Sequence, residues 1–197
     1  MNGTPTIKTT MLNTLSSSAR LPSRPRTLIH PGPFNPVRIS TLHAPRGRHL
    51  RLTLSPGLSL FDALVKPLHA AGIQSASTTL LGGYFSSLFY CVAPPDPSGQ
   101  AVIAYTEPIG AGAGCMIFGN ATMGWTAKSQ AIVHCYAAIQ TAAGDIKGGH
   151  ILTSMSIIGP QPITVLVTSL DGFELRVAYD SETNISLLQP QQKAHHE

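Results

Sequence analysis

The sequence has little charge, and its first 61 residues contain no acidic side chain. Asp, Glu, Lys and Arg make up 11% of the 197 residues, whereas hydrophobic residues make up 43%. So few charges are unusual for a freely exposed monomer, and we expect another subunit to cover part of the surface. All the positive excess lies in residues 1–61, which carry eight basic residues: Lys8, Arg20, Arg24, Arg26, Arg38, Arg46, Arg48 and Arg51.

Long apolar runs and paired cysteines are also missing. No segment approaches the roughly 20 apolar residues of a transmembrane helix, and the start lacks the apolar stretch of a secretory signal. The three cysteines, Cys91, Cys115 and Cys135, form no C-x-x-C pair. Their number and spacing favour free thiols in a reducing compartment over a disulfide framework or a zinc ribbon. We therefore predict a soluble, cytoplasmic protein without a membrane partner.

Several catalytic and nucleic-acid motifs are absent. The chain has no G-x-S-x-G nucleophile elbow, no Walker loop and no G-x-G-x-x-G after a strand. It has no helix-turn-helix pair, zinc finger or ribonucleoprotein motif. Arg24-Pro25-Arg26 matches half of an AT-hook core, but its glycine is missing. These absences favour a non-enzymatic protein without a standard DNA-reading element.

Composition divides the chain into four parts. Residues 1–28 have little apolar periodicity and predict a disordered basic tail, although a Ser/Thr/Arg-rich start also suits an organelle transit peptide. Residues 29–47 are rich in proline and apolar side chains, which predicts an extended segment lying on the body. Residues 48–190 form the domain, and residues 191–197 are polar and predict a frayed end.

One helix and several strands are expected within the domain. Ser59 and Asp62 form a capping box, apolar residues follow at helical spacing, and Gly72 ends the helix. Strand patterns cover residues 48–54, 101–109, 162–170 and 173–180, and further strands are broken at Gly82-Gly83. Asp171-Gly172 predicts a tight hairpin turn, and the glycine-rich residues 111–125 have no clear assignment.

The most informative stretch is residues 131–158. The runs AIVHCYAAIQT and GHILTSMSII flank a break at Gly144-Asp145, which predicts an antiparallel hairpin. His134 and Tyr136 share a face, whereas Cys135 points to the other. Gly148 and Gly149 precede His150 and permit a bulge or a close approach by another strand.

These residues resemble the signature of the PPC domain (plants and prokaryotes conserved), also found in proteins described as DNA-binding. The resemblance extends from about Arg48 to about Pro190. It implies an α+β fold, with a largely antiparallel sheet and one principal helix, that assembles as a homotrimer. Strand runs that are apolar on both faces independently favour cover from another subunit.

The resemblance also implies a zinc site made by three imidazoles, two from an H-x-H strand and one from the G-G-H element. Here the candidate ligands are His134 and His150, and Tyr136 stands in place of the second histidine. A phenol with a pKa near 10 is a weak ligand at neutral pH. A two-residue turn at Gly144-Asp145 would place His150 opposite Ile139, on the wrong face. A shared site would then need His150 from a neighbouring subunit or a less regular strand path.

Three functions stay open at this stage. The first is a PPC-like DNA-binding or regulatory protein, non-enzymatic and trimeric, with phosphate contacts from the front segment: Arg20, Arg24, Arg26, Arg46 and Arg48. The second is a metal or small-molecule site, catalytic or not, at the subunit interface around His134 and His150, where Glu107 and Asp145 could add acid/base groups. The third is an assembly module, with both histidines merely hydrogen-bonded.

Overall fold

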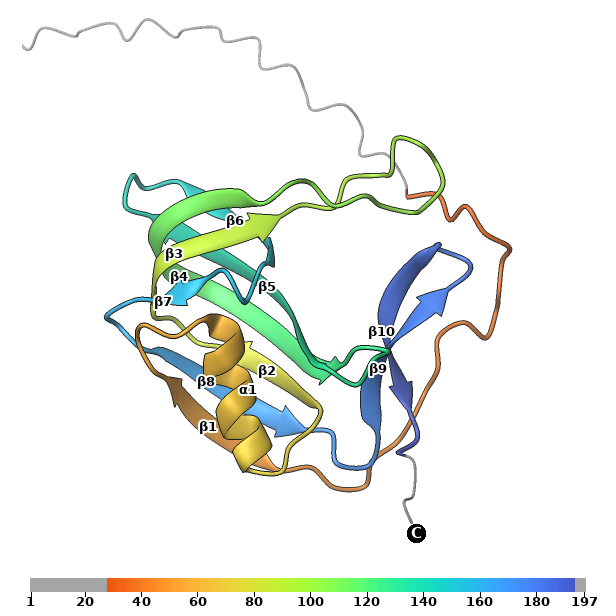
Figure 1. The fold of residues 1–197 in the computed structure, drawn as a ribbon, viewed down its shortest axis with the longest axis horizontal. Coiled ribbons are helices and arrows are strands. Elements are labelled where there is room, and N and C mark those ends of the chain that lie inside the picture. The colour runs from red at the N-terminus through yellow and green to blue at the C-terminus, as the bar shows by residue number, and fades with distance from the viewer. Residues whose placement is uncertain (1–27, 194–197) are drawn as a thin grey trace, which may run out of the picture.

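The computed structural model describes residues 28–193, which form a mostly antiparallel sheet and one helix, α1 (Leu60–Ala70) (Figure 1). This confirms the predicted α+β class. The strands are β1 (His49–Leu54), β2 (Ala76–Leu80), β3 (Tyr84–Cys91), β4 (Ile109–Trp125), β5 (Ala131–Thr141), β6 (Ile146–Ile151), β7 (Ile157–Ile158), β8 (Ile163–Ser169), β9 (Glu174–Asp180) and β10 (Ile185–Gln191). No helix within these residues is long and apolar enough to cross a membrane.

The sheet follows the order β1-β8-β2-β4-β5-β6-β3-β7, and β3 also pairs with β4. Strands β3, β4, β5 and β6 therefore close into a ring of hydrogen-bonded neighbours. The 17-residue β4 contains the glycine-rich stretch that had no assignment. A Cβ on Gly114 would lie 2.6 Å from the carbonyl oxygen of Gln140. Gly114 therefore occurs here because the neighbouring strand leaves no room for a side chain, and it does not mark a loop.

Helix α1 begins and ends where the sequence predicts. The Ser59 hydroxyl accepts a hydrogen bond from the backbone N–H of Asp62 and donates one to its carboxylate. At the other end Gly72 has a φ of 67°, and its N–H bonds to the carbonyl of His69. The helix buries Leu60, Leu64 and Leu68 in the core beneath the sheet, together with the fully buried Phe85 and Ile139.

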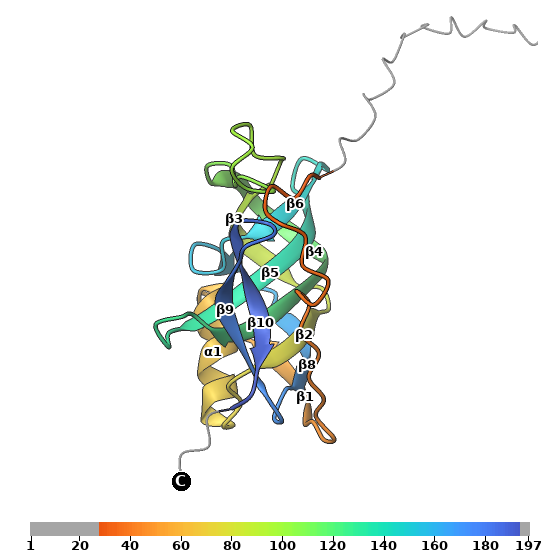
Figure 2. The ribbon, with the colours of Figure 1, turned by 90° about the vertical axis from the view of Figure 1, so that its right-hand side faces the viewer.

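The hairpin β9–β10 stands apart from the main sheet (Figures 1 and 2). Within residues 28–193 its strand pairing with that sheet is limited to Arg176 and Trp125 of β4. The predicted hairpin at Asp171-Gly172 is therefore wrong, because β8 pairs with β1 and β2, whereas β9 pairs with β10. Gly172 is not among the described residues with positive φ. Asp171 is instead bound by the Arg48 guanidinium, and a Cβ on Gly172 would collide with Ala44.

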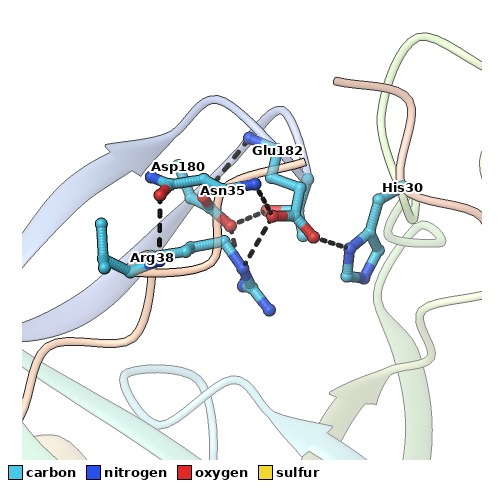
Figure 3. A network of polar contacts seen from close by, with 7 residues as sticks. His30, Asn35, Arg38, Asp180 and Glu182 are labelled. Atoms are coloured by element: carbon cyan, nitrogen blue, oxygen red, sulfur yellow. Dashed lines mark hydrogen bonds and ion pairs between the residues drawn. The ribbon is translucent and has the colours of Figure 1, made fainter. Parts of the chain in front are cut away.

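Residues 28–47 run along the β9–β10 hairpin and bind its turn through a polar network (Figure 3). His30 Nδ1 lies 2.5 Å from one oxygen of Glu182, and the backbone N–H of Asn35 donates to the other at 2.8 Å. Arg38 donates to Asp180 at 3.0 Å. Both carboxylates are buried. The front segment thus holds the tip of the hairpin in place.

Two further strand predictions need correction. Residues 101–108 form no strand, because they follow the turn at Asp96–Gly99 and their backbone hydrogen bonds are split between Pro94, Val92 and Thr183. Strand β10 was missed, and it extends to Gln191. Pairing with β9 makes these residues a strand, although Pro190 and the glutamines beside it do not predict one. Residues 1–27 and 194–197, which include most of the predicted basic tail, lie outside the described residues.

Candidate functional site

The hairpin β5–β6 places His134, Tyr136 and His150 on one face within a single chain. Tyr136 is the direct partner of His150, so the predicted pairing of His150 with Ile139 is wrong. The turn is the cause: its closing bonds join Thr141 to Asp145 and Gly144 to Thr141, and Gly144 takes the positive φ of 87°. Three residues, Ala142 to Gly144, form the loop instead of two at Gly144-Asp145. This changes the register by an odd number of residues and moves His150 to the other face.

Gly148 and Gly149 make this register sterically possible. A Cβ on Gly148 would lie 2.1 Å from the carbonyl oxygen of Ala137, and one on Gly149 would lie 2.6 Å from that of Cys91. The β5–β6 pairing runs without a register shift. The close approach was therefore predicted correctly, and the bulge that was its alternative does not form.

Four rings meet at this point. The ring centroids of His134 and His150 are 4.5 Å apart, and that of Tyr136 is 5.0 Å from His134 and 5.5 Å from His150. Tyr105, from the irregular segment after the proline-rich turn, packs on His150 at 5.0 Å. Tyr105 was not among the predicted site residues. A segment assigned as an ordinary strand gave no signal that one of its side chains reaches the histidines.

The ring cluster forms the polar end of a cavity of about 780 Å³ between the sheet and the β9–β10 hairpin. The remaining wall is mainly aliphatic and comes from three parts of the chain. Its lining residues are Ile103, Thr122, Ile132, Leu175, Val177, Ile185, Ser186, Leu187 and Leu188. A mostly apolar hollow of this size with a few convergent polar groups is typical of a small-molecule site.

Burial shifts the pKa values of three groups in the cluster: it lowers those of the two histidines and raises that of Tyr105. It lowers the pKa of His134, and burial together with the nearby His134 lowers the pKa of His150 to about 4. Burial and the neighbouring Tyr136 raise the pKa of Tyr105 to about 12. Within residues 28–193, the buried Nδ1 of His150 has no hydrogen-bond partner. At neutral pH the site therefore offers neutral imidazoles and a protonated Tyr105 phenol.

The other chemical candidates lie elsewhere. Cys135 is fully buried on the core side, as its position next to His134 predicted, and burial raises the pKa of its thiol to about 12. Asp145 sits at the turn, 3.5 Å from Lys147, and Glu107 is exposed. Neither carboxylate lines the cavity, so the structure does not bring the predicted acid/base groups to the histidines.

The predicted phosphate-binding arginines are separated from this site. The Arg48 guanidinium donates two hydrogen bonds to the Asp171 carboxylate, at 2.9 and 2.7 Å. It also donates to the carbonyls of Ala71 and Gly72, which follow helix α1. Arg46 is exposed. The remaining three, Arg20, Arg24 and Arg26, lie outside the described residues. Elsewhere in the described chain, Arg38, Lys66, Lys147 and Arg176 also form ion pairs with carboxylates.

No protein-family model and no curated protein sequence matches the chain, but solved structures share its fold. A plant- and prokaryote-conserved (PPC) protein from Pyrococcus horikoshii superposes with a TM-score of 0.58 at 13% identity, over 77% of this chain and 100% of that one. A metal-containing protein from Archaeoglobus fulgidus gives 0.57 at 19%, over 75% and 96%. A "Putative DNA-binding protein" from Ralstonia eutropha gives 0.57 at 18%, over 70% and 88%.

These similarities define the fold of the described residues as PPC-like, as the sequence signature predicted. The match covers nearly the full length of each neighbour. At such low identity it shows the fold alone. Any function must therefore be argued from the residues of this chain.

Proposed function

We propose that the PPC-like domain is a binding module whose site is the ring cluster of Tyr105, His134, Tyr136 and His150. The observation that carries this proposal is their convergence at the polar end of a 780 Å³ cavity. Purely structural histidines would be expected to have their ring nitrogens hydrogen-bonded, whereas within residues 28–193 the buried Nδ1 of His150 meets no partner. A bound molecule would supply that partner. Within residues 28–193 no carboxylate lines the cavity, and burial raises the pKa of the nearby Cys91 and Cys135 thiols, which favours binding over catalysis.

Histidine-selective NMR during a fragment screen tests this proposal. Fragments that bind should shift the ring signals of His134 and His150. His49 and His69, which are exposed and do not line the cavity, serve as internal controls. A screen whose binders move only the control histidines, or that yields no binder, would refute the binding site.

The same cluster could hold a metal ion, as the resemblance implies for zinc. Neutral imidazoles are the form that binds metal, and the rings of His134 and His150 meet edge to face here with centroids 4.5 Å apart. No group of three His, Cys, Asp or Glu suited to a metal occurs among residues 28–193. A metal form of the site would therefore need an ion held by His134 and His150, with Tyr136 or a bound molecule as the third ligand. Elemental analysis of protein purified without chelators should find metal that the His150→Ala variant lacks; finding no zinc, iron or manganese excludes this form.

DNA contact by the front segment is a second candidate. Two observations favour it. Residues 1–61 carry eight basic side chains and no acidic one, and the Ralstonia neighbour is named a putative DNA-binding protein. Many basic side chains of the described domain are already in ion pairs with carboxylates. The contacts with DNA phosphates would therefore come chiefly from Arg20, Arg24 and Arg26, with Arg46. Replacing these four by Gln should weaken duplex binding and flatten its salt dependence. A variant that binds DNA as tightly as the wild type would eliminate this role.

We also propose the homotrimer, in a cytoplasmic setting, as the assembled form. One line of paired residues crosses the outer face of the sheet: Arg51, Leu166, Thr79, Asn120, Tyr136, His150 and Cys91. On this face Leu166 of β8 is 46% exposed, and Phe118, two residues before Asn120 on β4, is 53% exposed. Contact with another copy would cover them and bring the site to a subunit boundary. Light scattering that finds a stable monomer at micromolar concentration would contradict the trimer.

A further inference from the structure

The wall of the cavity opposite the ring cluster narrows the chemistry of a ligand. β9 contributes Leu175 and Val177, and β10 contributes Ile185, Leu187 and Leu188. The sheet and the segment before Tyr105 add Ile132 and Ile103. An apolar ligand body would displace water from this wall, gaining roughly 25 cal/mol for each Å² of apolar surface buried.

The cavity carries no fixed charge. Of the described residues that line it, none is Asp, Glu, Lys or Arg. Its ionisable groups are the two histidines and two tyrosines of the cluster. A ligand ion placed here would lose hydration without gaining a counter-charge, which is unfavourable.

The polar groups are nevertheless suited to a hydrogen-bonding head. A protonated phenol such as Tyr105 donates, and the bare nitrogen of a neutral imidazole accepts. The rings crowd one end, whereas Thr122 and Ser186 are the only hydroxyl side chains among the other lining residues that the structure describes. One head group at the cluster and an apolar body along β9–β10 would match this distribution.

Resting on the proposed binding site, we propose that the cavity takes a small uncharged molecule with an apolar body and a single hydroxyl or carbonyl head. The head exchanges hydrogen bonds with His150 and Tyr105, and the body lies between Ile132 and the β9–β10 hairpin. A carboxylate, a phosphate or an ammonium of the same shape is rejected. The selectivity comes from the missing counter-charge rather than from a steric gate.

Calorimetry on the full chain, stripped of metal with a chelator, tests this ligand class with three matched probes: 2-naphthol, 2-naphthoate and 2-naphthylmethylammonium. We expect 2-naphthol to bind at least about tenfold more tightly than either ion at pH 7.5. Equal binding of all three, or preference for an ion, overturns the neutral class but leaves the binding site intact. The absence of any binding overturns the neutral class as well, and the NMR screen then decides whether the binding site itself fails.

A pair of valine substitutions locates the probe. Val177→Trp fills the cavity from β9 and should abolish 2-naphthol binding, whereas Val37→Trp makes the same change at a side chain that is 79% exposed and should not alter it. Circular dichroism and Tm establish that both variants fold. Should Val177→Trp fail to fold, the smaller change Leu188→Phe replaces it. A folded cavity variant that retains wild-type affinity contradicts the assigned location.

Discussion

Tyr136 and His150 are direct partners across the β5–β6 hairpin, and their rings meet edge to face with centroids 5.5 Å apart. This one pairing decides whether the candidate site exists within a chain. A register one residue away would place His150 on the core side. The binding, metal and assembly proposals all depend on it.

Replacing Gly148 by Ala should destabilise the protein and disturb this register. The added Cβ would lie 2.1 Å from the Ala137 carbonyl oxygen, so β6 must move away from β5. We expect a loss of about 2–4 kcal/mol in the free energy of unfolding, measured by urea denaturation. Gly110→Ala is the control, because its Cβ would meet only the Phe89 ring at 3.5 Å. Equal stability of the two variants would argue against the close approach.

The free energy of unfolding should fall as the pH decreases from about 6.5 to about 4. In the folded chain the pKa of His150 is lowered to about 4, so the unfolded chain binds more protons in that window. After allowance for the partial exposure of the ring, the loss should be about 1–2 kcal/mol. His150→Gln should reduce this slope, whereas His43→Gln, at an exposed loop position, should not. An unchanged slope in His150→Gln would show that this ring titrates normally.

Local patterns predicted the helix, its caps and the PPC-like fold, but they did not predict the register of the hairpin. Ser59, Asp62 and Gly72 act through neighbouring backbone groups, so their spacing alone carries the information. The choice between a turn at Gly144-Asp145 and one at Ala142–Gly144 depends on cross-strand packing. Choosing the correct turn required knowing that Gly148 lies against Ala137 of the neighbouring strand.

The larger part of the cavity could not be predicted for the same reason. His134, Tyr136 and His150 were found because histidines stand out in apolar strands. Tyr105 and the aliphatic residues of β9 and β10 reach them only through long-range contacts. The hairpin itself was misassigned at Asp171, whose carboxylate binds Arg48 from the other end of the domain. Asp171 and Gly172 do form a turn, but the strands on its two sides pair with other strands and not with each other.

Arg48 should contribute to stability through Asp171, whatever its role towards DNA. Its guanidinium makes the two-pronged contact that lowers the pKa of Asp171 to about 2, and it also satisfies two carbonyls after α1. We expect Arg48→Ala to lower Tm by a few degrees and Arg48→Lys to recover only part of the loss, because an ammonium cannot form the fork. Arg46→Ala, at an exposed neighbouring position, is the control. Equal Tm values for Arg46→Ala and Arg48→Ala would mean that the paired hydrogen bonds from Arg48 to Asp171 do not contribute to stability.

The network at the tip of β9–β10 should control how firmly the hairpin covers the cavity. Arg38 is paired with Asp180 at 3.0 Å, and both Asp180 and Glu182 are buried. The Arg38→Ala variant lacks the positive charge that neutralises the two buried carboxylates. The tip of the β9–β10 hairpin should therefore open more often. Hydrogen exchange of residues 174–191 should become faster in this variant, while that of β5 stays unchanged. Arg51→Ala, on the exposed side of β1, is the control and should leave both regions as in the wild type.

Acid should open the same hairpin in the wild type, in a lower pH range than the histidine effect. Burial opposes ionisation of Asp180, but the Thr183 hydroxyl and the Arg38 guanidinium outweigh it and lower its pKa. The Asn35 N–H and His30 lower the pKa of Glu182. Groups with lowered pKa stabilise the folded state above their unfolded values near 4, and this contribution is lost as the pH falls through the lowered values. Faster exchange of residues 174–191 should therefore begin below pH 4, and exchange that stays unchanged below pH 4 would contradict this role of the two carboxylates.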